Sequence, residues 1–166
     1  MRIWKACLFS CALPAIFCLA VFPQIGVLPK KNVTLKDATD DRFRVGDVWE
    51  YATQKGEEHS RLTIVKIDQS PELGLIVHVG VDNLRFSNCH GGPKPQAVPH
   101  MPFARKALEA SVTKQVASKQ PLPDFQGGYE DWKTAYSKKK AGVYIFSVGD
   151  AVSVAERTFR AGINCE

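Results

Sequence analysis

One stretch of the sequence gathers residue types that can do chemistry. Cys89 and His90 are adjacent, and His100 follows in the same proline- and glycine-rich segment, residues 87–102. A thiolate beside an imidazole is the arrangement of a cysteine nucleophile with its base, and cysteine with histidine is also a zinc-ligand set. The spacing requires neither arrangement, so a loop that is bridged or solvated is favoured. We therefore assign no catalytic residue, no metal and no cofactor.

The number and positions of the cysteines suggest that a disulfide holds this loop. Cys7, Cys11 and Cys18 lie in an apolar N-terminal stretch, so only Cys89 and Cys165 remain for the rest of the chain. In an oxidising compartment, two such cysteines favour a single disulfide. Two free thiols are the alternative.

Established sequence motifs for catalysis are absent from the chain. It has no phosphate-binding G-x-x-x-x-G-K or G-x-G-x-x-G loop, no H-E-x-x-H, no C-x-x-C and no G-x-S-x-G. The sequence thus gives no direct sign of an enzyme.

Four aromatic residues could form either a ligand-binding surface or the buried face of a helix. Phe125, Tyr129, Trp132 and Tyr136 are spaced four, three and four apart, which places them on one side of a helix. They are either a ligand platform or a buried helix face, and we favour burial because the predicted sheet needs a helix to cover it. Asp124 is suited to cap this helix. Gly127-Gly128 weakens the first turn, so the helix is expected to begin near Tyr129.

The elements that would position these residues are mixed in type. Apolar alternation predicts strands, with His78 on the exposed side of its strand because its parity is opposite to that of the apolar set. A Ser147-x-x-Asp150 pattern predicts the start of the last helix, and Gly162 its end. The sequence predicts an α+β fold, an antiparallel sheet of about four strands covered by two or three helices in the order β-β-β-α-α-β-α. The predicted strands are 43–53, 60–68, 73–86 and 142–147, and the predicted helices are 103–117, 125–136 and a segment ending at 162.

The charge distribution argues against nucleic acid as a partner. Two of the 22 basic residues and none of the 17 acidic residues lie in the first 29 positions, so the remainder carries a net charge of only +3. Acidic residues are interleaved with basic ones almost throughout, whereas nucleic-acid binders concentrate basic residues on one face.

The N-terminus reads as an export signal. Arg2 and Lys5 precede an uncharged apolar run from residue 6 to residue 22 that can be extended to residue 28. This layout fits residues 1–29 as either a cleaved signal peptide or an N-terminal membrane anchor, with membrane contact only through residues 6–28. Residues 30–42 are predicted to be a linker, and residues 43–166 a single globular domain.

Three segments carry a resemblance to known proteins. They are F-x-V-G-D-V-W-x-Y at 43–51, L-T-I-V-K-I at 62–67 and P-L-P-D-F-Q-G-G-Y-E-D-W at 121–132. Together they resemble small uncharacterised bacterial exported proteins. The resemblance implies a cell-envelope or periplasmic location and brings no catalytic residue with it.

The sequence therefore favours a non-enzymatic exported protein of the immunity or accessory type. We expect it to bind another protein through the 87–102 loop, with Arg85, His90, Lys94 and His100 as the candidate contacts, because recognition residues tend to lie on loops held by a rigid sheet. The alternative is a small hydrolase or ligand-binding enzyme that uses Cys89, His90 and His100.

Overall fold

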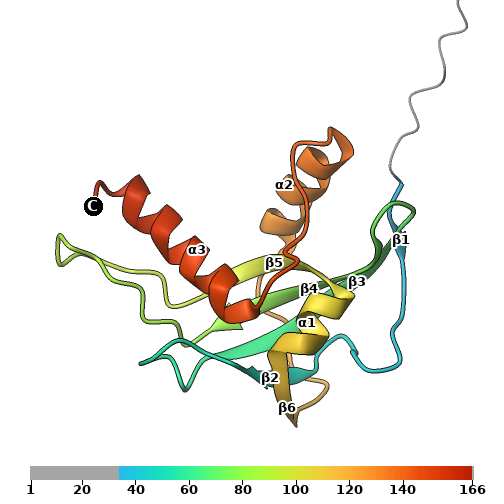
Figure 1. Cartoon of the computed structure of the whole chain (residues 1–166), viewed down its shortest axis with the longest axis horizontal. Coiled ribbons are helices and arrows are strands. Elements are labelled where there is room, and N and C mark those ends of the chain that lie inside the picture. The colour runs from blue at the N-terminus through green and yellow to red at the C-terminus, as the bar shows by residue number, and fades with distance from the viewer. Residues whose placement is uncertain (1–33, 166) are drawn as a thin grey trace, which may run out of the picture. The chain divides into compact units, whose positions relative to one another are not determined.

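The computed structural model describes residues 34–165, in which an antiparallel sheet of six strands and three helices confirms the predicted α+β class (Figure 1). Five strands follow the order β5-β4-β3-β2-β6, and β1 pairs with β3. The strands are β1 (Lys36–Asp37), β2 (Val48–Tyr51), β3 (Arg61–Ser70), β4 (Gly74–Asp82), β5 (Val98–Ala104) and β6 (Val112–Ala117), and the helices are α1 (Arg105–Ser111), α2 (Gln126–Ser137) and α3 (Val148–Gly162).

A β-bulge in β3 sets the faces of the sheet. The pairing of β3 with β4 shifts register between Ile64 and Lys66. Because a bulge adds one residue to one strand, Ile64 and Ile67 point to the same core although their spacing is odd. The same shift places Asp68 on the opposite face, under α2.

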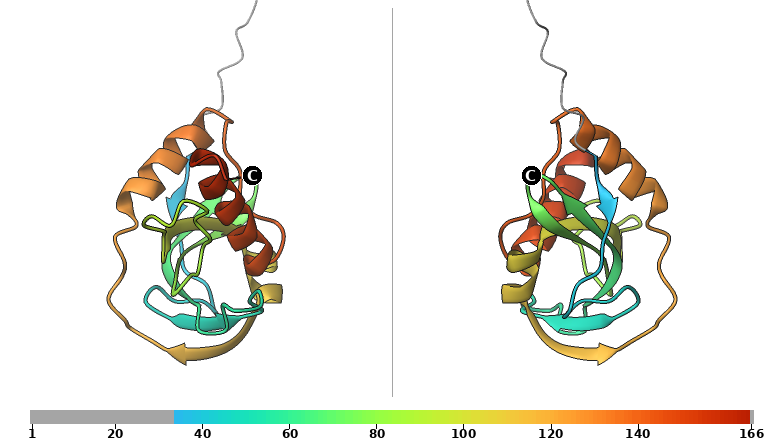
Figure 2. Two further views of the ribbon diagram at one scale, coloured as in Figure 1. Left: turned by 90° about the vertical axis from the view of Figure 1, so that its left-hand side faces the viewer. Right: turned by 90° about the vertical axis from the view of Figure 1, so that its right-hand side faces the viewer.

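Each face of the sheet has its own core. Figure 2 shows α2 on one side of the strands and α1 on the other. On one face, Phe103 and Val79 pack with Leu108 of α1 and Val152 of α3. On the other face, the aromatic side of α2 packs on Val65 and Ile76. The aromatic side chains in this second core are Phe125, which directly precedes α2, and Tyr129, Trp132 and Tyr136 of α2, all at most 9% exposed. The aromatic side of the helix is therefore core.

Helix α2 starts earlier than the sequence suggests. It begins at Gln126 rather than near Tyr129, and its N-terminus has no side-chain cap, so Asp124 does not cap it. Gly128 has a reason to be glycine, because a Cβ there would lie 3.0 Å from the Cβ of His100. The glycine lets α2 approach β5 closely.

The predicted helix 103–117 is wrong beyond residue 111. Only α1 is helical, and Val112 begins β6, which pairs antiparallel with β2 at the edge of the sheet. The segment contains the β-branched residues Val112, Thr113 and Val116, and pairing with a neighbouring strand overrides a weak helical pattern.

The predicted strand 142–147 is also wrong. It contributes a single parallel bridge between Tyr144 and Phe103, held by the Tyr144 N–H on Pro102 O at 2.8 Å and the Ala104 N–H on Tyr144 O at 2.9 Å. Beyond this bridge the segment forms no ladder with the described strands, and Ile145 next to it is 76% exposed. The start and end of α3 are as predicted, with the Ser147 hydroxyl accepting from the Asp150 N–H at 3.1 Å and Gly162 as its last residue.

The segment preceding the predicted domain takes part in the fold. β1 lies within the predicted linker, and Asp40 accepts from the Arg105 guanidinium at 2.8 Å. The predicted signal or anchor, residues 1–29, lies outside the described residues. Between residues 34 and 165, no helix is both long and apolar enough to cross a membrane.

Candidate functional site

Two histidines, of which only His100 was a predicted site residue, lie elsewhere than the sequence suggested. His78 was expected on an exposed face, but it is fully buried, because α2 covers the face to which its parity assigns it. His100 was expected in a loop, but the chain becomes strand β5 at Val98, so His100 lies beside His78 on the adjacent strand.

Asp68, His78 and His100 form a connected polar chain beneath α2. The Nδ1 of His78 lies 2.9 Å from the Nε2 of His100, and the two rings stack with centroids 5.1 Å apart. The Nε2 of His78 is 3.2 Å from Asp68 Oδ2, within ion-pair range but outside hydrogen-bond geometry. The Tyr129 hydroxyl donates to the same carboxylate oxygen at 2.8 Å. A carboxylate only accepts, so the network places the His78 proton on Nε2 and leaves Nδ1 to accept from His100.

Burial controls the protonation of this chain. It lowers the pKa of His100 to about 4, and the neighbouring His78 adds to the effect. It also lowers the pKa of His78, although Asp68 opposes this. Burial alone would raise the pKa of Asp68, but contacts with His78 and Tyr129 outweigh it and the pKa is lowered. At neutral pH the chain therefore holds an ionised carboxylate and two neutral imidazoles.

A carboxylate–imidazole–imidazole chain could relay a proton, provided that a nucleophile or substrate stood at its end. His100 makes one side-chain hydrogen bond to the described residues, and that bond goes to His78. No serine, threonine or cysteine of this part of the chain is bonded to it. The polar chain of Asp68, His78 and His100 thus connects β3, β4, β5 and α2 without reaching a nucleophile among residues 34–165.

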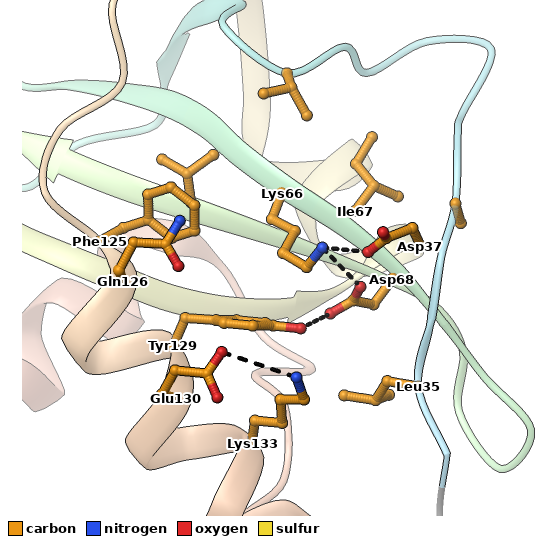
Figure 3. A pocket seen from close by; sticks show the side chains of 13 residues that line it. Leu35, Asp37, Lys66, Ile67, Asp68, Phe125, Gln126, Tyr129, Glu130 and Lys133 are labelled. Atoms are coloured by element: carbon orange, nitrogen blue, oxygen red, sulfur yellow. Dashed lines mark hydrogen bonds and ion pairs between the residues drawn. The ribbon is translucent and has the colours of Figure 1, made fainter.

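An open groove of about 660 Å³ runs between α2, β1 and β3 (Figure 3), here called the α2 groove. Lys66 lies in it and contacts both Asp37 and Asp68, the latter at 3.4 Å. Burial acts to lower the pKa of Lys66, but these two carboxylates outweigh it and raise the pKa. Lys133 lies 3.8 Å from Glu130 on the rim. The charges of the groove are therefore largely paired with one another.

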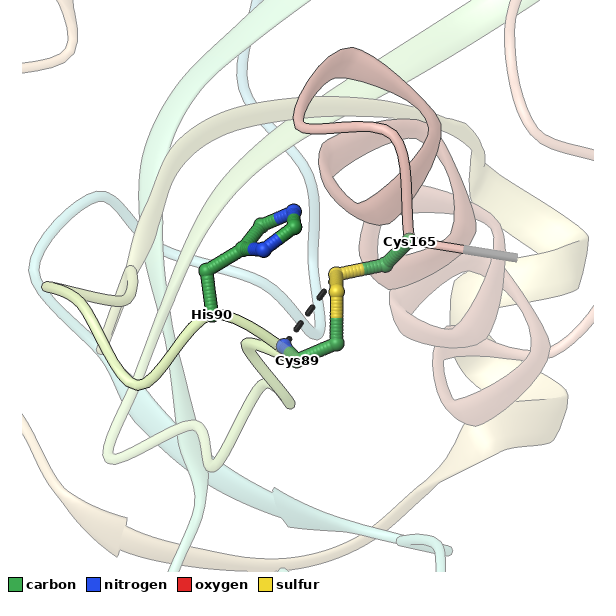
Figure 4. A group of neighbouring side chains, drawn as sticks. All are labelled: Cys89, His90 and Cys165. Carbon is green, nitrogen blue, oxygen red and sulfur yellow. Dashed lines mark hydrogen bonds between the residues drawn. A yellow bond between two sulfur atoms is a disulfide. The ribbon is translucent and has the colours of Figure 1, made fainter.

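The connection between β4 and β5, residues 83–97, is the β4–β5 loop. Cys89 forms a disulfide with Cys165, which confirms the predicted bridge (Figure 4). The loop is also hydrogen-bonded to α3 and its end, with the Ser87 N–H donating to Glu156 at 2.7 Å and His90 Nε2 donating to Ile163 O at 2.8 Å. Within the loop, the Asn88 amide donates to Pro93 O at 2.8 Å. An exposed loop is thus held at several points.

The predicted cluster of Cys89, His90 and His100 does not assemble. The Cys89 sulfur is in the disulfide, and the His100 side chain is bonded to His78. The residue that joins Cys89 and His90 is Cys165, and the ligand atoms of these three lie within 4.8 Å of one another.

Two cations of the loop are available to a partner. Arg85 and Lys94 are exposed, and neither side chain makes a hydrogen bond or an ion pair with another described residue. The β4–β5 loop contains no aspartate or glutamate. The charges that the loop itself carries are therefore positive, and acidic side chains of neighbouring segments lie near its start, where Glu57 and Glu156 accept from its backbone N–H groups.

Comparisons with protein-family models, with curated proteins and with solved structures found no match to this chain. The resemblance to small bacterial exported proteins therefore stays a prediction.

Asp68 was not predicted as a site residue, and His78 was predicted on the exposed side of its strand. The sequence carried a signal for His78 alone, because His78 lies on the non-core parity of its strand and the aromatic helix needed a face to cover. Asp68 shares the parity of the core residues Leu62 and Ile64, so only the bulge in β3 brings it to the face of His78.

Proposed function

We propose that this is a non-enzymatic, exported cell-envelope protein that binds another protein through its β4–β5 loop. The observation that carries the proposal is that the loop is exposed and yet tied to α3 by a disulfide and hydrogen bonds. A loop held before binding loses less conformational entropy on association.

The charge of the loop indicates the kind of partner. Arg85 and Lys94 form no ion pair with another described residue, although Arg85 interacts electrostatically with Glu58, so Lys94 is the cation that most lacks a counter-charge. A partner with an acidic surface would supply the missing counter-charges, which raises the association rate and fixes orientation. The α2 groove is a weaker candidate because its lysines already contact carboxylates.

The hydrolase alternative lacks support from the geometry. It needs a thiolate at Cys89 next to an imidazole, but this sulfur is bonded to Cys165 and His100 belongs to the network beneath α2. Export is compatible with the disulfide, since such bonds persist in oxidising compartments.

The partner surface can be tested by photo-crosslinking in envelope extract. A crosslinking residue at Gln96, an exposed position of the same loop, should capture a defined protein, and the Arg85→Glu/Lys94→Glu double variant with the same crosslinker should lose it. The matched control is Lys106→Glu/Lys138→Glu, which reverses two exposed charges on α1 and at the end of α2. Equal capture by both double variants would contradict the placement.

Export is tested separately. Residues 1–42 fused to a reporter that is active only outside the cytoplasm should give activity. A stable but silent fusion would contradict export, and N-terminal sequencing of the extracted protein would distinguish a cleaved signal from an anchor.

A further inference from the structure

We propose that, when the disulfide is reduced, Cys89, His90 and Cys165 form a three-ligand site for a zinc ion. This site would be at the C-terminal end of α3, where it would hold the β4–β5 loop in place of the disulfide. The proposal does not depend on the identity of the protein partner.

The geometry of the three side chains fits such a site (Figure 4). Their ligand atoms lie within 4.8 Å of one another, and the two cysteine Cα atoms are 5.8 Å apart. Zinc bonds of about 2.3 Å to sulfur and about 2.0 Å to nitrogen require neighbouring ligand atoms roughly 3.4–3.8 Å apart in a tetrahedral site. Small movements of the three side chains, two of them exposed, therefore suffice.

His90 is held in the form that a metal needs. Its Nε2 lies 2.8 Å from the Ile163 carbonyl oxygen, and because a carbonyl only accepts, Nε2 carries the proton. Nδ1 then keeps its lone pair. Histidines that bind metals commonly donate their other ring N–H to a backbone carbonyl in this way.

A backbone donor favours a thiolate, whereas the end of α3 favours the bound cation but opposes a thiolate without metal. The Cys89 backbone N–H lies 3.1 Å from the Cys165 sulfur, and a donor directed at sulfur stabilises its ionised form. Cys165 follows α3 closely, and its N–H is bonded to the Arg160 carbonyl. The C-terminal end of a helix carries partial negative charge, which attracts a cation.

The zinc site would form in two steps, reduction of the disulfide and then binding of the metal. A dithiol reductant transfers two electrons and two protons, so that its own thiols become a disulfide while Cys89 and Cys165 become free thiols. Zinc then displaces one proton from each thiol and binds the two thiolates and the His90 imidazole. A solvent water completes the coordination.

The test uses the full chain, reduced with a phosphine that does not compete for zinc and then freed of metal. Wild-type protein should bind one more zinc per chain than the Cys89→Ser/Cys165→Ser variant, which keeps Cys7, Cys11 and Cys18 and so measures their background. Cobalt in place of zinc should give a thiolate-to-metal charge-transfer band that the double variant lacks. Oxidised wild-type protein should match the double variant.

The role of His90 has its own control. His90→Ala should weaken zinc binding by about tenfold or more, whereas His59→Ala, which removes an exposed histidine of the β2–β3 connection, should not change it. Tryptophan emission would report whether each reduced chain is folded. Equal zinc uptake by reduced wild type and the double variant would overturn the proposal. So would equal affinities of the two histidine variants, or a reduced chain that stays unfolded with zinc.

Discussion

The Nε2 of His100 lies 2.9 Å from the Nδ1 of His78, so a hydrogen bond between two neutral imidazoles joins β5 to β4 beneath α2. His78 in turn faces Asp68 of β3 at 3.2 Å. The polar chain thus crosses three strands, and α2 contacts it through Tyr129.

This arrangement predicts a loss of stability in mild acid. The pKa of His100 is about 4 in the fold and near 6.5 in the unfolded chain, so the unfolded chain binds more protons between these values. The free energy of unfolding should be highest above pH 6.5 and fall as the pH is lowered towards 4. We expect a loss on the order of 2 kcal/mol from this group, with allowance for solvent screening at the half-buried ring.

Urea unfolding across that pH range measures the effect. His100→Gln removes the titrating group and should flatten the profile, although it also lowers stability at neutral pH. His59→Gln, at an exposed position, should give the same dependence of the free energy of unfolding on pH as the wild type. A profile that is equally steep with and without His100 would contradict the assignment.

Asp68 should be important for stability. Asp68→Ala removes the acceptor of the Tyr129 hydroxyl, the carboxylate that faces Nε2 of His78, and a counter-charge of Lys66. Because buried polar groups would lose their partners, we expect a cost of about 3 kcal/mol in the free energy of unfolding. Asp131→Ala, on the exposed side of α2, should change it by less than about 0.5 kcal/mol. Chemical denaturation of both variants gives the comparison.

Trp132 offers a graded test of the second core. Trp132→Ala should cost about 3–5 kcal/mol because the side chain is only 9% exposed. Trp132→Phe keeps most of the apolar area but loses the hydrogen bond from Nε1 to the Gly142 carbonyl, which is 2.8 Å long. Trp132→Phe should therefore lower the free energy of unfolding clearly less than Trp132→Ala does. Equal melting temperatures for wild type and Trp132→Ala would place the ring at the surface and revive the platform hypothesis.

Alanine substitutions at two neighbouring glycines of α2 should change the stability of the protein in opposite directions. A Cβ at Gly127 would have no atom within 4 Å, so Gly127→Ala should stabilise the protein by about 0.5–1 kcal/mol through helix propensity. A Cβ at Gly128 would lie 3.0 Å from the Cβ of His100, which cannot move away without shifting β5. Gly128→Ala should therefore lower the melting temperature, and stabilisation by both substitutions would contradict the close approach of α2.

The disulfide should contribute substantially to stability. Its two cysteines are 76 residues apart, and closing a loop of this size contributes about 4 kcal/mol in the chain-entropy model. Cys89→Ser/Cys165→Ser should lose that amount in urea unfolding without zinc. Alkylation of protein isolated without reductant should modify neither cysteine, and two reactive thiols would contradict the bridge.

The sequence by itself determined the features that depend on local pattern. The spacing of Phe125, Tyr129, Trp132 and Tyr136 predicted a buried helix face, and the Ser147 pattern predicted the start of α3. The pairing of Cys89 with Cys165 was predicted because they are the only two cysteines outside the apolar N-terminal stretch. In each case neighbouring residues or a single remaining partner carry the information.

Only the tertiary structure decided which face of the sheet His78 occupies and where His100 lies. Both faces of the sheet are covered, so the parity of a residue identifies its face but not its exposure. The bulge in β3 moves Asp68 under α2, and pairing with β2 turns the segment after Ser111 into a strand. These outcomes depend on contacts between residues distant in the chain, and no local pattern of apolar residues encodes them.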